Sequence, residues 1–369
     1  MATNNAGSTK GFCFAATVFS ALCAVVAQTL IARRTEFQHA LRAWYRTHAR
    51  SLPWRDEPSL YKTVVSEFML QQTQVKTVLP YLARWLAELP DFPALAAAPE
   101  ARVLKLWEGL GYYSRARNLH RLAQQVAAWP KMKRTPAAWR ELPGVGPYTS
   151  AAITSISFGA PAACVDGNVV RILARLTADA TDFRDSASAS KSFTPLAEAL
   201  LPAASPGDHN QAMMELGATV CFRHNPLCLT CPVQAFCAAA RRGEPEAFPR
   251  LAAKQMEQRS VMRVWCEHQG TLLLHRSAAG ARRFANIHEL PTAEQAALDP
   301  SKVARGELLA KKRRGITRFQ ITESIYAAAA PRSPLPAELV WVSLADLATL
   351  TLSGPHRRWV AEIAAKRTP

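Results

Sequence analysis

Residues 142–173 constrain the fold of this chain more than any other segment. They begin Leu-Pro-Gly-Val-Gly-Pro-Tyr-Thr and end Val-Asp-Gly-Asn-Val-Val-Arg-Ile-Leu. Gly144 and Gly146 tolerate positive φ and let a ligand approach the backbone, which predicts a tight turn. A helix over 147–158 would begin with proline and present free N–H groups, which favour an anion such as a DNA phosphate. Taken alone, the motif is also typical of an ordinary turn.

Size and charge narrow the class of protein. The chain has 369 residues, more than one ordinary hydrophobic core accommodates, so we expect two domains. Lysine and arginine number 45 against 28 acidic residues, which gives a net charge of +17. An excess spread along the chain favours a polyanionic partner, nucleic acid before an anionic membrane, although a solvated basic surface has the same composition.

The N-terminal segment 12–32 is apolar and carries no charged residue. Its length could span a bilayer, and Val-Val-Ala at 25–27 is typical of a signal-cleavage site. A membrane anchor, an export signal and an appendage outside the functional fold are the three interpretations. We favour an appendage over 1–35. The expected location is the cytoplasm beside the nucleoid, with no membrane role for the core; membrane attachment through this segment stays open.

Periodicity divides the rest of the chain. Apolar residues recur at intervals of three and four over 36–240, which predicts a helical domain. A polar linker is expected over 241–257. Beyond it, residues 258–369 predict an α+β domain. Its expected strands cover 261–267, 271–275, 316–327 and 339–342, and its expected helices cover 343–350 and 355–365.

Four cysteines give the strongest local signal: Cys221, Cys228, Cys231 and Cys237, spaced C-x6-C-x2-C-x5-C. Thiolates so close in sequence can surround one metal ion or one cluster, whereas disulfides are not expected in a reducing cytosol. Structural zinc usually shows two C-x2-C pairs, and this run has one. Spacing alone therefore favours zinc and iron–sulfur equally.

The cysteine spacing, the hairpin and the Val-Asp-Gly-Asn-Val segment together resemble the helix-hairpin-helix DNA glycosylases that carry a 4Fe–4S cluster. Residues 52–55 with 66–75, and residues 107–120, narrow this to adenine DNA glycosylases of the MutY type. The resemblance covers 36–240 closely. It implies an all-α domain with a 4Fe–4S loop and a monomer that removes adenine from A·8-oxoguanine or A·G pairs in double-stranded DNA. The hairpin residues implied to hold DNA are Leu142, Gly144, Val145 and Gly146.

Breaking an N-glycosidic bond needs an acid for the leaving base and a charge for the cationic sugar. Glu67 has apolar neighbours over 64–69, where desolvation would raise its pKa and keep a proton available. Asp166 could stay ionised and stabilise the oxocarbenium ion. The resemblance assigns these roles and adds Tyr148 and Asn168 as neighbours that order the site. A paired carboxylate and a helix cap are the structural alternatives for Glu67 and Asp166.

A base inside a duplex must be flipped out before an enzyme can reach it. Tyr112 can stack in the gap and Gln72 can hydrogen-bond to a base edge. The resemblance places the matching tyrosine and glutamine beside the oxidised guanine. It also extends the implied DNA contacts to Gln71, Arg55 and Arg115. Core packing for Tyr112 and plain solvent-facing roles for the glutamines are the alternatives.

One absence is informative. Lyases of the endonuclease III type carry a lysine two positions after the second hairpin glycine, where it attacks the sugar as an amine. This chain has Tyr148 there, and residues 141–170 contain no lysine. We therefore expect a monofunctional glycosylase that leaves an abasic site without cutting the strand.

The C-terminal part contains Trp341-Val342, Leu347, Leu350, Pro355-His-Arg-Arg358 and His288-Glu-Leu-Pro291. Through these residues it resembles the Nudix-like domain with which the family checks the base opposite adenine. The pyrophosphatase signature with its clustered glutamates is missing, so we expect binding without hydrolysis. Where the family shows Phe-Ser-His, this chain has Ile-Thr-Arg-Phe over 316–319. We expect Thr317 and Arg318 to contribute to lesion recognition. The aromatic and the histidine of the family motif are absent from positions 316–318.

Two rival classes remain. The first is another enzyme of the superfamily, a thymine glycosylase for G·T mismatches or an endonuclease III-like lyase, which Tyr148 and Glu67 argue against. The second is a non-catalytic iron–sulfur DNA-binding protein or a membrane-tethered one. The presence of both Glu67 and Asp166 argues against that class.

Overall fold

The computed structural model describes residues 24–253, 255–278, 280–281, 285–331 and 334–367. Residues 1–23, which hold most of the expected hydrophobic extension, lie outside this description. Within the described parts of the chain, no helix has the length and apolar character that crossing a membrane requires. The chain groups into two compact units, residues 1–67 with 129–253 and residues 68–128 with 254–369. These units do not coincide with the expected domain boundaries.

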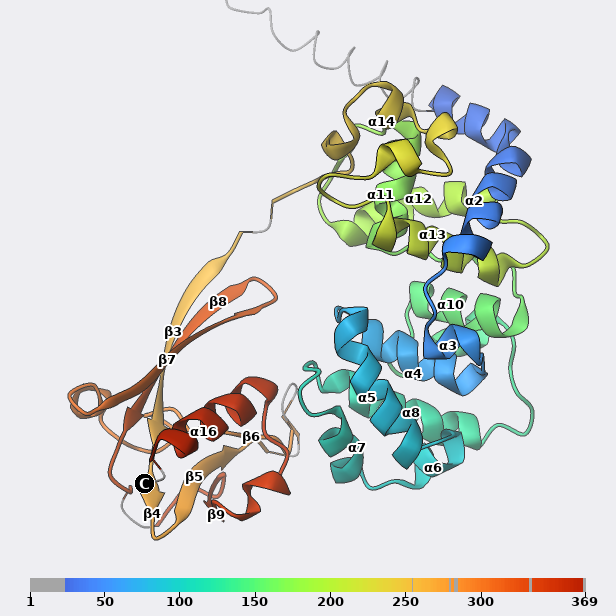
Figure 1. Cartoon of the computed structure of the whole chain (residues 1–369). Helices are drawn as coiled ribbons and strands as arrows, with labels where there is room; N and C mark the ends of the chain where they lie inside the picture. Colours follow the sequence, from blue (N-terminus) through green and yellow to red (C-terminus); the bar gives the residue numbers. More distant parts are fainter. Residues whose placement is uncertain (1–23, 254, 279, 282–284, 332–333, 368–369) are drawn as a thin grey trace, which may run out of the picture. The chain divides into compact units, whose positions relative to one another are not determined.

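The first unit is built mainly from helices (Figure 1), and its larger apolar core joins several of them. Phe37 and Leu41 of α2, Leu173 of α11 and Leu216 of α13 lie in that core and are buried. Its helices are α2 (Arg34–His48), α3 (Pro53–Asp56), α4 (Leu60–Leu70, to residue 67), α9 (Pro136–Arg140), α10 (Pro147–Phe158), α11 (Gly167–Thr177), α12 (Ser186–Leu200), α13 (Pro206–Thr219) and α14 (Ala238–Arg241).

The helix predicted over 147–158 is confirmed as α10. Pro147 suits its first turn because proline fixes φ and has no N–H to leave unpaired. Gly159 ends it in a left-handed conformation, with φ of 68°. The helix α11 follows, with one apolar side packed in the core and the Asp166 side chain accepting from Val169 N at its start.

A short parallel pair lies in the segment expected to be a linker. Strand β1 (Asp182–Phe183) pairs with β2 (Arg250–Leu251). The backbone hydrogen bond from Ala252 N to Phe183 O extends the pairing over 2.9 Å. Residues up to 253 therefore belong to the first unit. The sequence does not predict this pair, because a strand of two residues is too short to show an alternating pattern.

The second unit begins with a helical part. It contains α5 (Val75–Glu88), α6 (Phe92–Ala97), α7 (Glu100–Trp107) and α8 (Ser114–Ala127). Trp85 and Trp107 pack edge to face with ring centroids 5.6 Å apart, which fixes α5 against α7. The loop between α7 and α8 carries Tyr112.

The remainder of the second unit is α+β, as expected. Strands β3 (Glu257–Trp265), β8 (Phe319–Ala327) and β7 (Leu308–Ile316) form one sheet in that order. A second sheet has the order β4 (Glu267–His268), β5 (Thr271–Arg276), β6 (His288–Glu289), with β9 (Leu339–Ser343) also paired to β5. The helix α16 (Gly354–Arg367) packs Trp359 and Ile363 into a core with Trp265 and Ile325.

Several local predictions in this part are wrong. The segment 261–267 does not pair with 271–275 as one hairpin, because β3 runs parallel to β8 and only β4 turns back on β5. The expected extended stretch 316–327 turns at Thr317 and Arg318. The expected helix over 343–350 forms only a 3-10 turn, Asp346–Ala348. Parallel pairing joins residues about sixty positions apart and leaves no local period.

Candidate active site

Glu67 lies near the end of α4, and its residue is only 8% exposed. Burial raises the pKa of its carboxyl to about 7, and the nearby Asp166 raises it further. A hydrogen bond from Tyr148 and the charge on Arg55 act in the opposite direction. The predicted elevation of this pKa is confirmed. At neutral pH the carboxyl is therefore protonated in a substantial fraction of molecules.

Tyr148 is the second residue of α10, so the helix after the hairpin places its ring beside Glu67. Its hydroxyl contacts Met214 Sδ at 3.0 Å and hydrogen-bonds to the Glu67 carboxyl. Burial, together with the two nearby carboxyls, raises the pKa of this phenol well above its ordinary value. The phenol therefore stays protonated and acts as a donor.

Asp166 is the N-cap of α11. Its Oδ1 accepts from Val169 N at 2.8 Å, and its Oδ2 accepts from Asn168 Nδ2 at 3.1 Å. Burial raises the pKa of this carboxyl, while the hydrogen bonds and the charge on Arg171 favour the ionised form. The helix-cap alternative is thus realised, and it is compatible with a functional role because it fixes the carboxylate beside Glu67.

Arg171 connects this aspartate to the cysteine segment. Its Nη2 donates to Asn168 Oδ1 at 2.8 Å and to Gly217 O at 2.9 Å. Its Nε donates to Cys221 O at 2.8 Å. A side chain at Gly217 would place Cβ 2.5 Å from Asn168 Cβ, so this approach requires glycine. Sequence reasoning missed Arg171, although its spacing of three from Asn168 on a helix was available as a signal.

The four cysteines lie together, since all of them line one pocket beside Arg175. Arg175 Nη1 donates to Cys221 Sγ at 3.2 Å and to Phe222 O at 2.6 Å, and its Nη2 donates to Arg223 O at 2.9 Å. Burial raises the pKa of Cys231 to about 12. Such a thiol ionises only with a positive partner such as a metal centre. No tight group of three or more ligands for one metal ion occurs among the described residues.

The hairpin leaves backbone groups available. Gly144 has φ of 76°, and Gly146 caps α10 without any side-chain hydrogen bond to its first turn. Leu142 and Val145 are buried, so their side chains anchor the turn and only its backbone can meet a ligand. The amides at the start of α10 are suited to an anion.

Arg55 does not have the free guanidinium that a direct DNA contact requires. Its Nη1 pairs with Glu215 Oε2 at 2.9 Å, and its Nε donates to Gln211 Oε1 at 3.1 Å. Glu215 is fully buried and also receives Arg50 Nε at 2.6 Å. The structure thus corrects the expected role: Arg55 neutralises a buried acid beneath the site.

Arg115 is corrected in the same way. Its residue is 6% exposed, and burial lowers its pKa to about 10, so it stays charged. One nitrogen donates to the carbonyls of Phe68, Met69 and Gln71, and the other donates to those of Leu110 and Gly111. Arg115 therefore ties the loop that carries Gln71 and Gln72 to the loop that carries Tyr112.

Tyr112 and Gln72 both have left-handed backbones, with φ of 47° and 58°. Non-glycine residues adopt this conformation at a cost, and such positions often serve a site. The ring of Tyr112 is 41% exposed, which rules out the core alternative. Gln72 is exposed and Gln71 partly so.

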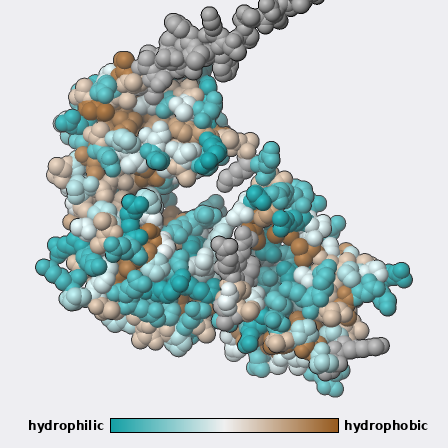
Figure 2. Space-filling model, turned by 180° about the vertical axis from the view of Figure 1, so that it is seen from behind, coloured by the Kyte–Doolittle hydropathy of each residue, from teal (hydrophilic) through white to brown (hydrophobic). Residues whose placement is uncertain are grey.

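Tyr112 also borders an open pocket of about 490 Å³ in the second unit. Thr317 lines it, and so do Arg314 and Arg358, two cations that were not among the expected lesion-recognition residues. Arg318, which was also expected to read the lesion, is not among the residues that line this pocket, and its Nε pairs with Glu257 Oε1 at 2.8 Å. On the face drawn in Figure 2 hydrophilic residues predominate and apolar ones occur in small groups.

The model of the HhH-GPD superfamily of base excision DNA repair proteins matches residues 65–194. The human adenine DNA glycosylase is 46% identical over 227 residues, covering 58% of this chain and 41% of that protein. The adenine DNA glycosylase of Buchnera aphidicola subsp. Acyrthosiphon pisum is 32% identical over 247 residues, covering 65% of this chain and 70% of that protein.

Among solved structures, a thermostable thymine-DNA glycosylase superposes with a TM-score of 0.49 and 26% identity, covering 57% of this chain and 98% of that one. The matches to the human, mouse and rat relatives span 41 to 45% of their lengths, less than half of each.

Proposed function

The chain belongs to the adenine DNA glycosylase family of the HhH-GPD superfamily, and we propose that it hydrolyses the N-glycosidic bond of adenine paired with 8-oxoguanine or guanine. The observation that carries this proposal is the pairing of two buried carboxyls with different environments. Glu67 has a pKa of about 7, and Asp166 is held by a helix N-terminus and by Asn168.

These residues divide the chemistry. Adenine is flipped out of the duplex, and the protonated Glu67 gives its proton to a ring nitrogen, which makes the base a better leaving group. As the bond to C1′ breaks, the ionised Asp166 stabilises the oxocarbenium ion electrostatically. Tyr148, held protonated, orients Glu67. Water then adds to C1′ and gives up a proton to the Glu67 carboxylate, which leaves an abasic sugar and a free base and restores the acid.

The reaction stops at the abasic site. A lyase needs an amine to attack C1′ and form a Schiff base. Tyr148 occupies the relevant position, and its protonated phenol beside Glu67 cannot form one. Strand nicking by the pure chain that disappears on mutation of one lysine would contradict this part of the proposal.

The DNA backbone is held by the hairpin. The N–H groups in the first turn of α10 after Pro147 would bind one phosphate, and the formal charge of +17 supports a polyanionic partner. Tyr112 and Gln72 fill the gap left by the flipped base. The base opposite adenine is read in the pocket lined by Tyr112 and Thr317, with Arg314 and Arg358 as additional contacts.

The four cysteines fit a 4Fe–4S cluster. They line one pocket, and Arg175 supplies a positive charge beside Cys221, which suits an anionic thiolate-ligated group. When bound, the cluster would supply iron–thiolate bonds that close the segment 221–237. Measurement of iron, acid-labile sulfide and zinc in the purified chain tests this assignment. One equivalent of zinc without iron would contradict it.

The activity itself is tested by base release from A·8-oxoguanine, A·G and T·G duplexes. We expect adenine from the first two and no thymine from the third. Release of thymine would favour the G·T mismatch glycosylase, and binding without any release would favour a non-catalytic DNA-binding protein.

A further inference from the structure

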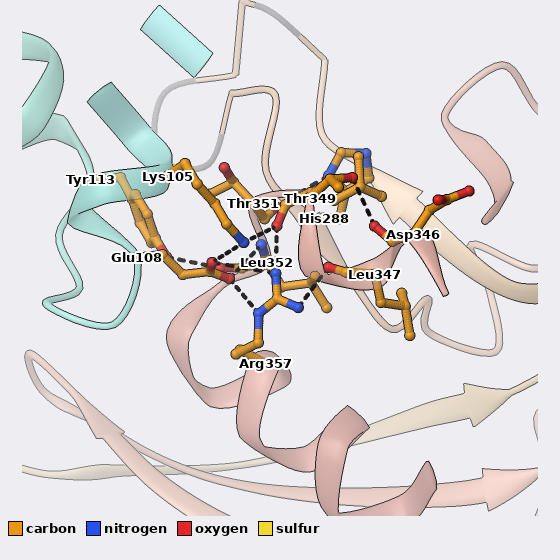
Figure 3. Close-up of polar contacts among 11 residues, drawn as sticks. Lys105, Glu108, Tyr113, His288, Asp346, Leu347, Thr349, Thr351, Leu352 and Arg357 are labelled. Atoms are coloured by element: carbon orange, nitrogen blue, oxygen red, sulfur yellow. Dashed lines mark hydrogen bonds and ion pairs between the residues drawn. The ribbon is translucent and has the colours of Figure 1, made fainter. Parts of the chain in front are cut away.

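We propose that Glu108 and Arg357 are positioning residues that hold the Tyr112 loop against the segment 347–358 and thereby set the geometry of the pocket. The inference rests on the proposed role of this pocket in reading the base opposite adenine. Figure 3 shows the contacts, which join the end of α7 to the chain before and within α16.

Glu108 is the centre of the network. Its Oε1 accepts from Leu352 N at 3.0 Å and from Arg357 Nε at 2.7 Å. Its Oε2 accepts from Lys105 Nζ at 2.7 Å. The side chain is only 9% exposed, so these partners replace almost all of its hydration. A buried carboxylate with charged donors on both oxygens is held firmly, because removal of a partner leaves an uncompensated charge.

Arg357 and Lys105 extend the network to backbone carbonyls. Arg357 Nη1 donates to Leu347 O at 2.6 Å, and Lys105 Nζ donates to Leu350 O at 2.8 Å. The Tyr113 hydroxyl donates to Leu352 O at 2.8 Å (Figure 3). Tyr113, which follows Tyr112 in the sequence, is thus bound to Leu352, the same residue that donates to Glu108.

The two backbones also touch directly. A Cβ on Gly354 would lie 3.3 Å from Gly109 Cα, and a Cβ on Gly109 would overlap the Tyr81 hydroxyl at 2.0 Å. The loop therefore has little room to shift relative to Gly354. Because Gly111, Tyr112, Gly354 and Arg358 all line the pocket, a shift at this contact would change its width.

Loss of the Glu108–Arg357 contacts should affect the preference for 8-oxoguanine over guanine and not the cleavage of the N-glycosidic bond. Glu67 and Asp166 belong to the other compact unit and make no contact with Glu108 or Arg357 among the described interactions. Loss of the network should leave the chemical step intact and weaken the preference for 8-oxoguanine over guanine. A merely structural role would instead lower both rates alike.

The test uses the full chain and single-turnover excision on A·8-oxoguanine and A·G duplexes. In Glu108→Gln and in Arg357→Gln, the ratio of the two rates should fall about tenfold, with the A·G rate within about twofold of the unmodified chain. The double variant should show no further fall, because both residues act in one network. Arg102→Gln is the matched control, since it breaks the half-exposed Arg102–Glu88 pair beside the same helices.

Hydrogen exchange supplies a readout that needs no activity. The Leu352 amide should exchange faster in Glu108→Gln and in Arg357→Lys than in Arg102→Gln, because it donates to Glu108 Oε1. Unchanged exchange, or an unchanged rate ratio in the Glu108 and Arg357 variants, overturns the inference. If the unmodified chain releases no adenine from either duplex, the proposed function fails instead, and the exchange experiment still tests the contact.

Discussion

The Asn168 side-chain amide donates to Oδ2 of Asp166 over 3.1 Å, while Val169 N donates to Oδ1 over 2.8 Å. Both carboxylate oxygens therefore have a fixed partner before any substrate arrives. Electrostatic stabilisation of a developing cation depends on such preorganisation, because no donors need to reorient during the reaction.

Replacing Asp166 separates its two roles. Asparagine is also a good N-cap, so Asp166→Asn should keep α11 and the melting temperature close to those of the unmodified chain. The rate of adenine release should fall about a hundredfold to a thousandfold, because the charge beside the sugar is lost. Circular dichroism and single-turnover excision measure the two effects. A rate within threefold of the unmodified chain would remove Asp166 from the mechanism.

Arg171 should act through Asn168. Arg171→Gln removes donors to Asn168 Oδ1, Gly217 O and Cys221 O, and we expect excision to slow about tenfold and urea unfolding to lose roughly 2 kcal/mol. Arg33→Gln serves as the control, because it breaks the exposed Arg33–Glu36 pair, a class that contributes little. Equal effects of the two substitutions would contradict the positioning role.

Glu67 gives a pH dependence of defined sign. Excision should decline as the pH rises through about 7, since the acid then loses its proton. Stability should follow the same group. The folded-state pKa lies above the ordinary 4.5, so the unfolded state releases this proton first and stability is lost between pH 4.5 and about 7.

The neutral variant Glu67→Gln should remove that loss. Relative to the unmodified chain it should gain up to about 3 kcal/mol between pH 4.5 and pH 8, because one pKa unit corresponds to 1.36 kcal/mol. Chemical unfolding at both pH values measures the gain. An identical pH dependence of stability in the two proteins would show that Glu67 titrates normally.

Substitution of Arg115 should reduce stability, whereas substitution of Arg358 should weaken DNA binding. Arg115→Met leaves buried carbonyls of both loops without donors and should cost about 3 kcal/mol of stability. Arg358→Gln alters an exposed pocket residue, so stability should stay within about 0.5 kcal/mol while binding of the 8-oxoguanine duplex weakens. Thermal melts and binding titrations distinguish them. Weaker DNA binding with unchanged stability in Arg115→Met would instead support Arg115 as a direct DNA contact.

Features that depend on residues close together in the sequence were predicted correctly. Proline and glycine marked the bounds of α10, and the apolar neighbours of Glu67 indicated its raised pKa. The predictions that failed concern residues whose partners are distant in the sequence. Arg55 resembled a free cation because its buried partner, Glu215, lies 160 positions away. The parallel pairing of β3 with β8 was missed for the same reason, because the paired residues are distant in the sequence. The pocket likewise brings Arg314 and Arg358 close to Tyr112, which lies about two hundred positions before them.

The central claim is tested most directly by single-turnover excision from an A·8-oxoguanine duplex with the unmodified chain, Glu67→Gln and Asp166→Asn. We expect the unmodified chain to release adenine and leave an abasic site that breaks only on alkali treatment. Glu67→Gln should be slower by about a hundredfold to ten-thousandfold, the usual contribution of a general acid. Absence of adenine release by the unmodified chain, or full activity in Glu67→Gln, would contradict the account.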